Sequence, residues 1–390
     1  MRPINVLELR SVRGTGGGPE KTILLGAART DRSRYAVTVC YIRDTRDGVF
    51  AIDVKAANLP VDYVEILERH SFDTGVWPAL RRIVRERSID IVHAHEYKTD
   101  LLAWLLHRFE GVIPLSTAHG WTGHSLRERF LYYPIGRMVL RGFPKVIAVS
   151  DDIRNRLIRS GVRPATVQTI LNGIDHTAFR RDPSQRDRIR AGLGLEPEDI
   201  AIGSVGRLEP QKRFDLLIDS LARMRADRPR LRLLVVGDGS LRETLDAQID
   251  RLGLRGVCQL LGHRGDIAAM HHAFDLFVQS SDYEGTPNAV LEAMALETPI
   301  VATDVGGTAQ LVRHGVDGLI IPSGNLDVLC AAIVSALSDG AGMAARVASA
   351  RQRVETDLSF ESRMATVEAV YTELYAERRP RSTGAIPART

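Results

Sequence analysis

The stretch SVGRLEPQKRFDLLIDSL, residues 204–221, joins the end of a strand, a turn and the start of a helix. A strand is expected over 200–205, and Gly206 and Arg207 follow directly at its end. After a short turn that contains Lys212, apolar residues recur at helical spacing. A strand followed at once by an amphipathic helix is the repeating unit of a parallel α/β sheet.

The same alternation of short β-branched runs and helical periodicity extends along the whole chain. It predicts strands at 5–9, 36–41, 62–66, 90–93, 113–117, 146–149, 167–170, 200–205, 231–236, 257–260, 276–279, 299–302 and 319–321. Helices are expected between most of these strands. The fold class is therefore α/β, with two Rossmann-like, doubly wound parallel sheets that bind ligands beyond the carboxyl ends of their strands.

A boundary between two domains is expected within 176–190, where charged residues and proline replace the alternating pattern. The predicted N-terminal domain covers 1–178 and the second domain covers 179–358. A last helix, within 359–378, is expected to pack back on the N-terminal domain, and the tail 379–390 to be disordered.

Composition is ordinary for a globular protein: of 390 residues, 44% are hydrophobic and 26% charged. A net charge of +4 suits an anionic substrate or membrane surface but is too small to indicate nucleic-acid binding. The odd set of cysteines, Cys40, Cys258 and Cys330, is widely spaced and is interpreted as reduced core residues. With neither a signal-peptide pattern nor a membrane-spanning run, a cytoplasmic location is expected.

The segment EGTPNAVLE, 284–292, places a carboxylate inside an apolar helix. Thr286 is expected to cap this helix and Pro287 to occupy its first position, which leaves backbone N–H groups pointing outward. Asn288 and Glu292 then share one face. A buried carboxylate is costly without hydrogen bonds, so Glu292 needs donors from protein, water or ligand hydroxyls.

Two cations and several glycines follow predicted strands of the second half. Arg207 and Lys212 rise from the same edge of the sheet and could converge on a diphosphate, or both could be solvated surface charges. The turns that contain Gly237, Gly239 and Gly262 would let a base or ribose approach the backbone, or they serve only as turns.

The loop RGTGGGPEK, 13–21, follows the first strand. When a dinucleotide-binding pattern is aligned on Gly14 and Gly16, Pro19 falls where the third glycine belongs, so a dinucleotide site is disfavoured. Three consecutive glycines, Gly16, Gly17 and Gly18, instead suit a flexible loop that closes over a diphosphate.

Histidines follow two predicted strands of the first half. His93 and His95 could both point to one side as metal ligands, but no third ligand lies at a suitable spacing, so a structural role is favoured. His119 follows the strand at 113–117, where a packed or exposed histidine is the usual finding.

Taken together, the motifs resemble glycosyltransferase family 4, a family of retaining, nucleotide-sugar-dependent enzymes with the GT-B fold. The resemblance covers nearly the whole chain. It rests on GTGGGPEK (14–21), DIVHAHE (90–96), TAHG (117–120), VIAVSDDIRNRL (146–157), LNGIDHTAF (171–179), GRLEPQKRFD (206–215) and the pair Glu284 and Glu292, spaced E-x7-E.

The resemblance implies catalytic roles for four residues. Arg207 and Lys212 would bind the diphosphate, Glu284 would bind hydroxyls of the donor sugar, and His119 would reach that sugar from the first domain. No protein nucleophile is assigned, because in such enzymes a phosphate oxygen is thought to take the proton of the acceptor hydroxyl.

The resemblance also implies the donor-binding set. Glu292 would hold the ribose hydroxyls, and backbone groups near His263 and Arg264 would recognise the base. The remaining members are Gly17, Gly18, Gly237, Gly285, Thr286, Pro287 and Asn288. No D-x-D motif is found, so no metal cofactor is expected, since a helix N-terminus and two cations can stabilise the leaving diphosphate.

The segment SLRERFLYYPIGRMVLRGF, 125–143, mixes aromatic residues with four arginines and one glutamate. It is either a basic amphipathic segment for peripheral contact with the inner face of an anionic membrane or a packing helix with a solvated arginine face.

These observations predict a retaining glycosyltransferase that uses a UDP- or GDP-sugar and a glycan or lipid-linked acceptor in cell-surface polysaccharide or glycolipid synthesis. The alternatives are a nucleotide-sugar epimerase of the same fold and a non-catalytic nucleotide-sugar-binding protein.

Overall fold

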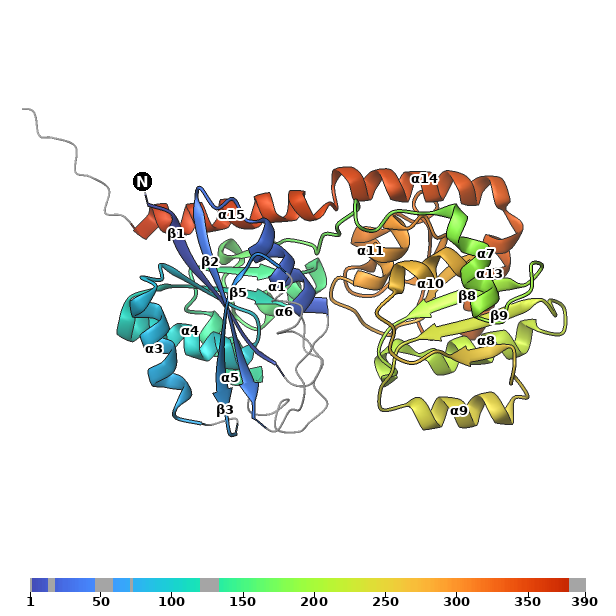
Figure 1. The fold of residues 1–390 in the computed structure, drawn as a ribbon, viewed down its shortest axis with the longest axis horizontal. Coiled ribbons are helices and arrows are strands. Elements are labelled where there is room, and N and C mark those ends of the chain that lie inside the picture. Colours follow the sequence, from blue (N-terminus) through green and yellow to red (C-terminus); the bar gives the residue numbers. More distant parts are fainter. Residues whose placement is uncertain (1, 13–17, 46–58, 71–72, 120–132, 379–390) are drawn as a thin grey trace, which may run out of the picture. The chain divides into compact units, whose positions relative to one another are not determined.

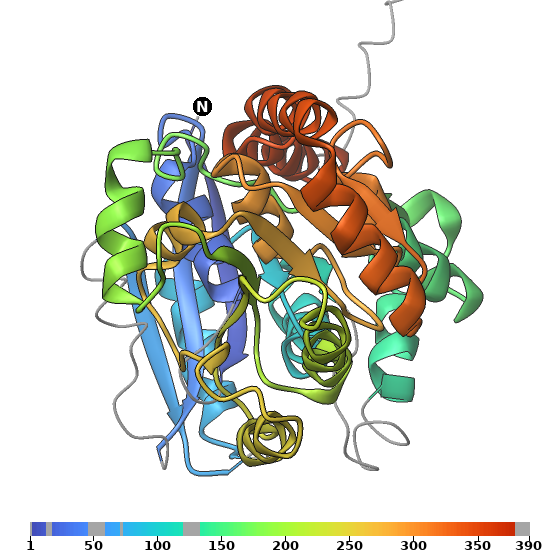
Figure 2. The same ribbon diagram turned by 90° about the vertical axis from the view of Figure 1, so that its right-hand side faces the viewer.

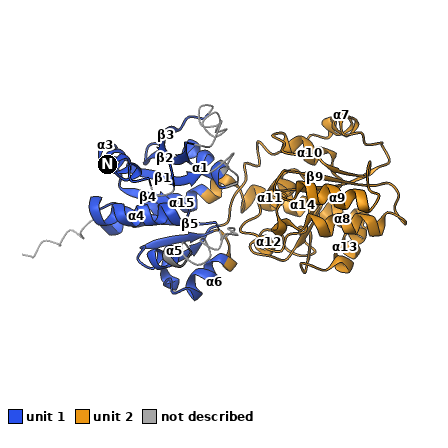
Figure 3. Ribbon diagram, turned by 90° about the horizontal axis from the view of Figure 1, so that it is seen from below, with its two compact units in different colours: residues 1–148, 153–170, 364–390 blue, residues 149–152, 171–363 orange. Residues whose placement is uncertain are grey.

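The computed structural model describes residues 2–12, 18–45, 59–70, 73–119 and 133–378. The chain forms two compact units (Figure 3). Unit 1 comprises residues 1–148, 153–170 and 364–390, and unit 2 comprises residues 149–152 and 171–363.

Unit 1 contains a seven-stranded parallel sheet in the order β3-β2-β1-β4-β5-β6-β7 (Figure 1). Its strands are β1 (Ile4–Val12), β2 (Tyr35–Asp44), β3 (Asp62–Glu68), β4 (Ile91–Ala94), β5 (Ile113–Ala118), β6 (Lys145–Ala148) and β7 (Val167–Thr169). Its helices are α1 (Gly18–Arg29), α3 (Val76–Glu86), α4 (Tyr97–Glu110), α5 (Tyr133–Leu140), most of α6 (Asp151–Arg159) and most of α15 (Phe360–Arg378). The strand order reverses direction between β1 and β4, which is the doubly wound arrangement.

Unit 2 contains a six-stranded sheet in the order β10-β9-β8-β11-β12-β13. Its strands are β8 (Ile200–Val205), β9 (Leu231–Val236), β10 (Cys258–Leu260), β11 (Leu276–Gln279), β12 (Ile300–Thr303) and β13 (Leu319–Ile321). Its helices are α7 (Arg186–Gly192), α8 (Phe214–Met224), α9 (Arg242–Arg251), α10 (Ile267–Ala273), α11 (Asn288–Ala295), α12 (Thr308–Leu311), α13 (Leu326–Ser338) and α14 (Gly340–Thr356).

Helices cover both faces of the second sheet (Figure 1, Figure 2). Apolar residues of α8, α9 and α13 form one cluster with the strands. On the other face, α11 and α14 contribute to a second cluster, and α10 contributes to a third. Both faces of the strands are therefore buried, which explains why their sequences are almost continuously apolar.

Helix α15 packs against the first sheet. Val367, Val370, Tyr371 and Leu374 are buried in a cluster with residues of β1, β2, β4, β5 and β6. This C-terminal helix thus completes the core of the unit that contains the N-terminus.

The boundary between the units lies between Ile170 and Leu171, not within 176–190 as predicted. The reason is that residues 171–178 pack with unit 2. Ile174 accepts a hydrogen bond from the Phe360 N–H at 2.9 Å, and its own N–H donates to the Leu358 carbonyl at 3.0 Å. These long-range backbone bonds cannot be read from a local change in composition.

The three cysteines are buried and none forms a disulfide, as predicted. In the described part of the chain, no individual helix combines the length and apolarity needed to cross a membrane. Helices α13 and α14 meet those criteria only as a pair, which bends by 96° at its junction.

Candidate active site

The loops that carry most of the predicted site follow the carboxyl ends of β8, β9, β10 and β11 in unit 2. Carboxyl ends of parallel strands lie along one edge of a sheet, which is where ligands bind in this fold class. Residues distant in sequence can therefore meet at this edge.

Glu284 and Lys212 form an ion pair at this edge. The Lys212 ammonium donates to Glu284 Oε1 at 2.6 Å, and the side chains are 18% and 8% exposed, respectively. Gln279 and Ser281 also donate to Oε1, at 3.0 and 2.7 Å. Among the described residues no side chain is found to donate to Oε2, so this second oxygen can accept hydrogen bonds from a ligand.

Arg207 lies outside this network. Its side chain is exposed and forms no hydrogen bond or ion pair within the described part of the chain. The structure thus joins Lys212 to Glu284 rather than to Arg207, and the predicted convergence of the two cations on a diphosphate stays a prediction.

A pair of glycines supports the backbone at Glu284, and sequence reasoning did not identify them. Gly306 has φ of 56°, and a Cβ atom there would lie 1.9 Å from the Glu284 carbonyl oxygen. The Gly307 N–H donates to the Gly285 carbonyl at 2.7 Å. The two adjacent glycines soon after β12 could have predicted that another backbone segment lies close to this loop.

Thr286 does not cap α11, contrary to the prediction. Its hydroxyl donates to the Val149 carbonyl, and Pro287 occupies the N-cap position with no side-chain cap. The hydroxyl is engaged by a distant segment of unit 2, so it does not bind the first turn of its own helix. Pro287 correspondingly precedes the first helical position rather than occupying it.

Asn172, another residue that sequence reasoning missed, holds the start of α11. Its side-chain amide donates to Asn288 Oδ1 at 3.0 Å, and its backbone N–H contacts the Thr286 hydroxyl at 3.4 Å. The motif LNG at 171–173 pointed to Asn172, but the sequence did not show that Asn172 bonds to Asn288, which lies far along the chain.

Glu292 is 8% exposed and lies on α11 beyond Asn288. Glu292 also interacts with another group of the protein itself. Its burial therefore does not by itself require a ligand, and the ribose assignment rests on the family resemblance.

The glycine turns bring backbones together. A Cβ atom at Gly237, whose φ is 142°, would lie 1.8 Å from the Gly206 carbonyl oxygen, and the Gly237 N–H donates to the Gly262 carbonyl at 2.8 Å. Next to this turn His263 is exposed, and Arg264 forms an ion pair with Asp266 at 2.6 Å. Gly237 is thus required by packing between β8 and β9.

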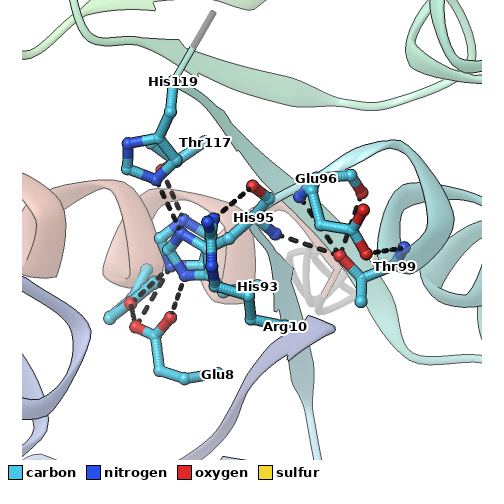
Figure 4. A network of polar contacts seen from close by, with 9 residues as sticks. Glu8, Arg10, His93, His95, Glu96, Thr99, Thr117 and His119 are labelled. Carbon is cyan, nitrogen blue, oxygen red and sulfur yellow. Dashed lines mark hydrogen bonds and ion pairs between the residues drawn. The ribbon is translucent and has the colours of Figure 1, made fainter. Parts of the chain in front are cut away.

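Unit 1 contains a cluster of polar residues from the middle of β1 and from the carboxyl ends of β4 and β5 (Figure 4). His93 and His95 both contact the Glu8 carboxylate, His93 at 3.2 Å. His95 Nδ1 lies 3.2 Å from Nε2 of His119. The third metal-ligating group, absent from the sequence near the histidines, is therefore Glu8 from another strand, and these three residues could hold a cation.

Gly17 lies outside the described residues, and Gly18 is the first residue of α1. Of the flexible loop predicted at 16–18 to close over the diphosphate, only Gly18 lies within the described residues.

Comparison with known proteins places this geometry in a family. A model of group 1 glycosyl transferases matches residues 185–353, and a model of glycosyltransferase family 4 matches residues 16–178. Together they account for most of both units. The chain belongs to the family 4 type of glycosyltransferases.

Relatives of the glycosyltransferase match two thirds or more of its length. It is 29% identical to D-inositol 3-phosphate glycosyltransferase of Rhodococcus opacus, over 94% of this chain and 90% of the relative. It is 29% identical to an Escherichia coli UDP-Gal:alpha-D-GlcNAc-diphosphoundecaprenol alpha-1,3-galactosyltransferase, over 67% and 70% of the two chains. These matches support a glycosyltransferase enzyme.

The fold is that of the GT-B glycosyltransferases, as predicted. The crystal structure of Anabaena Alr3699/HepE in complex with UDP superposes with a TM-score of 0.82 at 23% identity, over 95% of this chain and all of the other.

Proposed function

We propose that this glycosyltransferase retains the anomeric configuration of the sugar it transfers from a UDP- or GDP-sugar to a glycan or lipid-linked acceptor. The product would belong to a cell-surface polysaccharide or glycolipid. The observation that carries the proposal is the Lys212–Glu284 ion pair at the carboxyl edge of the second sheet, beside the start of α11. A cation beside a hydrogen-bond-accepting carboxylate supports the proposal, because the family resemblance implies that these two residues bind the diphosphate and the donor sugar.

The relatives support a uridine donor and a sugar-containing acceptor. Anabaena Alr3699/HepE was crystallised with UDP and with UDP-glucose, and the E. coli relative is named for UDP-Gal and a diphosphoundecaprenol acceptor. GDP-sugars stay in the proposal because we expect backbone groups to recognise the base. The identity of the side chains then does not distinguish uracil from guanine.

In the proposed reaction, the acceptor oxygen bonds to the anomeric carbon from the face on which the bond to the diphosphate breaks. A phosphate oxygen of the leaving nucleoside diphosphate takes the acceptor proton. Lys212 and Arg207 stabilise the developing negative charge, and backbone N–H groups at the start of α11 add to this. Glu284 Oε2 accepts hydrogen bonds from sugar hydroxyls and so orients the ring.

We also propose that the enzyme needs no metal ion, because two cations and a helix N-terminus can stabilise the diphosphate. Transfer should therefore persist in EDTA. Loss of transfer in EDTA and its recovery with Mg²⁺ or Mn²⁺ would contradict this.

The first test is the thermal stability of the purified chain with UDP, GDP, ADP and their sugars. A nucleotide present at 100 times its Kd should stabilise the fold by about 2.7 kcal/mol. The nucleotide that shifts the melting temperature then defines the donor series for transfer assays. The anomeric configuration of the product is read by NMR. No shift with any nucleotide would contradict the proposed function, and an inverted product would contradict retention alone.

A further inference from the structure

The Glu284 carboxylate is held through one of its two oxygens. Oε1 accepts hydrogen bonds from the Lys212 ammonium at 2.6 Å, the Ser281 hydroxyl at 2.7 Å and the Gln279 side-chain amide at 3.0 Å. Within the described ranges Oε2 has no partner, and it is not one of the polar atoms that lack both a partner and solvent exposure. Oε1 is therefore fully occupied, whereas Oε2 is open to a ligand.

The three donors to Oε1 differ in charge and in exposure. Lys212 is charged and its side chain is 18% exposed, so an anionic ligand at this edge of the sheet can attract it. Gln279 and Ser281 are neutral and buried, with 5% and 1% of their surface exposed. Because these two residues are buried, a ligand does not compete for their N–H and O–H groups. They can hold Glu284 while Lys212 binds a ligand.

The orientation of the Gln279 amide follows from its two neighbours. A carboxylate that accepts from an ammonium has no proton to donate, so the NH₂ group of Gln279 faces Glu284. The amide oxygen faces the Thr308 hydroxyl, 3.4 Å away. The reverse orientation would place the amide oxygen against the carboxylate oxygen. Gln279 is therefore a donor to Glu284.

Both neutral donors are fixed by two interior strands of the second sheet. Gln279 is the last residue of β11 and pairs with Ala302 of β12. The Ser281 carbonyl accepts a hydrogen bond from the Thr303 hydroxyl at 2.7 Å. Because their anchors are strand residues, these donors do not depend on the loop after β8 that contains Lys212.

We infer that Gln279 and Ser281 are positioning residues that keep Glu284 Oε2 directed at the donor sugar while Lys212 binds the diphosphate. The identity of the ligand rests on the proposed function, whereas the hydrogen bonds do not. Oε2 can accept hydrogen bonds from one or two sugar hydroxyls. Their full strength requires a carboxylate that is already oriented, so Gln279 and Ser281 act on the sugar and not on the nucleotide.

The first test compares UDP, which lacks the sugar, with the UDP-sugar that supports transfer. GDP and the GDP-sugar replace them if thermal stability selects guanosine. In the double variant Gln279→Met, Ser281→Ala, kcat/KM for the donor should fall about 10- to 100-fold, as expected for two lost hydrogen bonds, with UDP affinity within about 2-fold of wild type. Equal losses for UDP and the donor would overturn the inference, because a displaced loop affects both. An unchanged kcat/KM would also overturn it.

The neighbouring serine provides a matched comparison. Ser280 is also 1% exposed, but its hydroxyl donates to the Lys212 carbonyl at 2.8 Å and lies 3.0 Å from the Arg213 carbonyl. Ser280→Ala should weaken UDP and donor binding by the same factor. Ser281→Ala should lower donor kcat/KM about 3- to 10-fold and leave UDP affinity unchanged. This single variant decides the question if the double variant does not fold.

A double-mutant cycle with Glu284→Ala separates positioning from a general structural role. If Ser281 acts through Glu284, Ser281→Ala should lower donor kcat/KM in the wild type but change it by less than about 2-fold in Glu284→Ala. Single-turnover assays at subsaturating donor give the four values. The same loss in both backgrounds would contradict the inference.

The hydrogen bond itself is tested without a ligand, by NMR of the full chain labelled with ¹⁵N-glutamine. The Gln279 side-chain signals are assigned from their absence in Gln279→Met. One amide proton of Gln279 should lie downfield of those of the exposed Gln352 and should move upfield in Glu284→Ala. Gln279 signals that are identical in wild type and Glu284→Ala would refute the contact on which the inference depends.

The two proposals fail in distinguishable ways. If transfer occurs but Ser281→Ala has the same effect with and without Glu284, the further inference is wrong and the proposed function remains. If no nucleotide-sugar supports transfer, the proposed function is wrong and the donor role of Gln279 and Ser281 falls with it. The Gln279 signals then still show whether Glu284 is held.

Discussion

At the scale of single residues, Lys212 and Arg207 show how two cations with one predicted role differ in their surroundings. Lys212 is mostly buried and bonded to Glu284, whereas Arg207 is exposed. Removing a partner from a buried ion pair leaves the other charge uncompensated, but removing an exposed charge costs little. The alanine variants of Lys212 and Arg207 should therefore differ in their free energy of unfolding, although both should lower the transfer rate.

We predict that Lys212→Ala lowers the free energy of unfolding by about 1–3 kcal/mol, because Glu284 loses its cation. Arg207→Ala should change it by less than about 0.5 kcal/mol. Both should lower the transfer rate at saturating donor about 100-fold or more, because each removes charge stabilisation of the leaving diphosphate. Urea unfolding and single-turnover assays measure the two effects, and equal transfer rates in Arg207→Ala and wild type would contradict its assignment.

Asp100 gives unit 1 a pH-dependent stability. It is 5% exposed in the first turn of α4, and burial together with Glu96 raises its pKa to about 8. A carboxyl whose pKa is higher in the folded state favours folding while it is protonated. Its contribution is complete below its unfolded pKa, near 4, and is lost as the pH rises toward 8.

We therefore predict that Asp100→Asn flattens the pH dependence of stability between pH 5.5 and 7.5. The wild type should lose up to about 1.4 kcal/mol per pH unit relative to the variant over this window. Melting temperatures of both proteins at several pH values provide the measurement. Parallel curves for the two proteins would show that Asp100 ionises normally.

At the scale of elements, the loop between β12 and α12 supports the loop that contains Glu284. The support is a contact between backbones at Gly306, so a side chain at that position must displace the Glu284 carbonyl. Gly315 is a suitable control because it also has a positive φ, 75°, but is exposed with nothing within 4 Å of an added Cβ.

Gly315→Ala should cost about 1–2 kcal/mol of stability, the cost of a left-handed conformation for alanine. Gly306→Ala should cost about 1–3 kcal/mol more, because the methyl group overlaps the backbone. It should also lower transfer, whereas Gly315→Ala should not. Equal stabilities of the two variants would show that the Glu284 loop moves freely.

At the scale of the whole molecule, the proposed lipid-linked acceptor raises the question of membrane contact. Residues 125–132 of the basic segment lie outside the described residues. Within α5, Met138 is 63% exposed, whereas Val139 and Leu140 are buried, so this part also packs in unit 1. Arg141 donates to the Ser160 carbonyl at 2.6 Å and should be left unchanged in a test of membrane binding.

We predict that the protein binds anionic vesicles and that Arg127, Arg129 and Arg137, changed together to glutamine, weaken this binding. Each arginine near the surface could contribute about 1 kcal/mol, and salt should reduce the effect. Changing the exposed arginines Arg180, Arg230 and Arg251 of unit 2 to glutamine removes equal charge and should leave binding unchanged. Cosedimentation at low and high salt measures both variants, and equal binding by the two triple variants would exclude a specific basic segment.

The sequence by itself determined the two parallel sheets and indicated His119, Lys212 and Glu284 as candidate site residues. Every predicted strand was found with ends within a few residues, because strand and helix periodicities are local and each βα unit repeats the same pattern. The order of motifs along the chain was enough to indicate the glycosyltransferase family.

Only the tertiary structure joined Glu8 to His95, Lys212 to Glu284 and Thr286 to Val149. These partners are separated by 72 to 137 residues. Their hydrogen bonds depend on which strands become neighbours in the sheet and on which loops meet at its edge. Local periodicity determines where a strand runs and which way its side chains face, but the partner of a buried polar group is decided by the packing of distant segments.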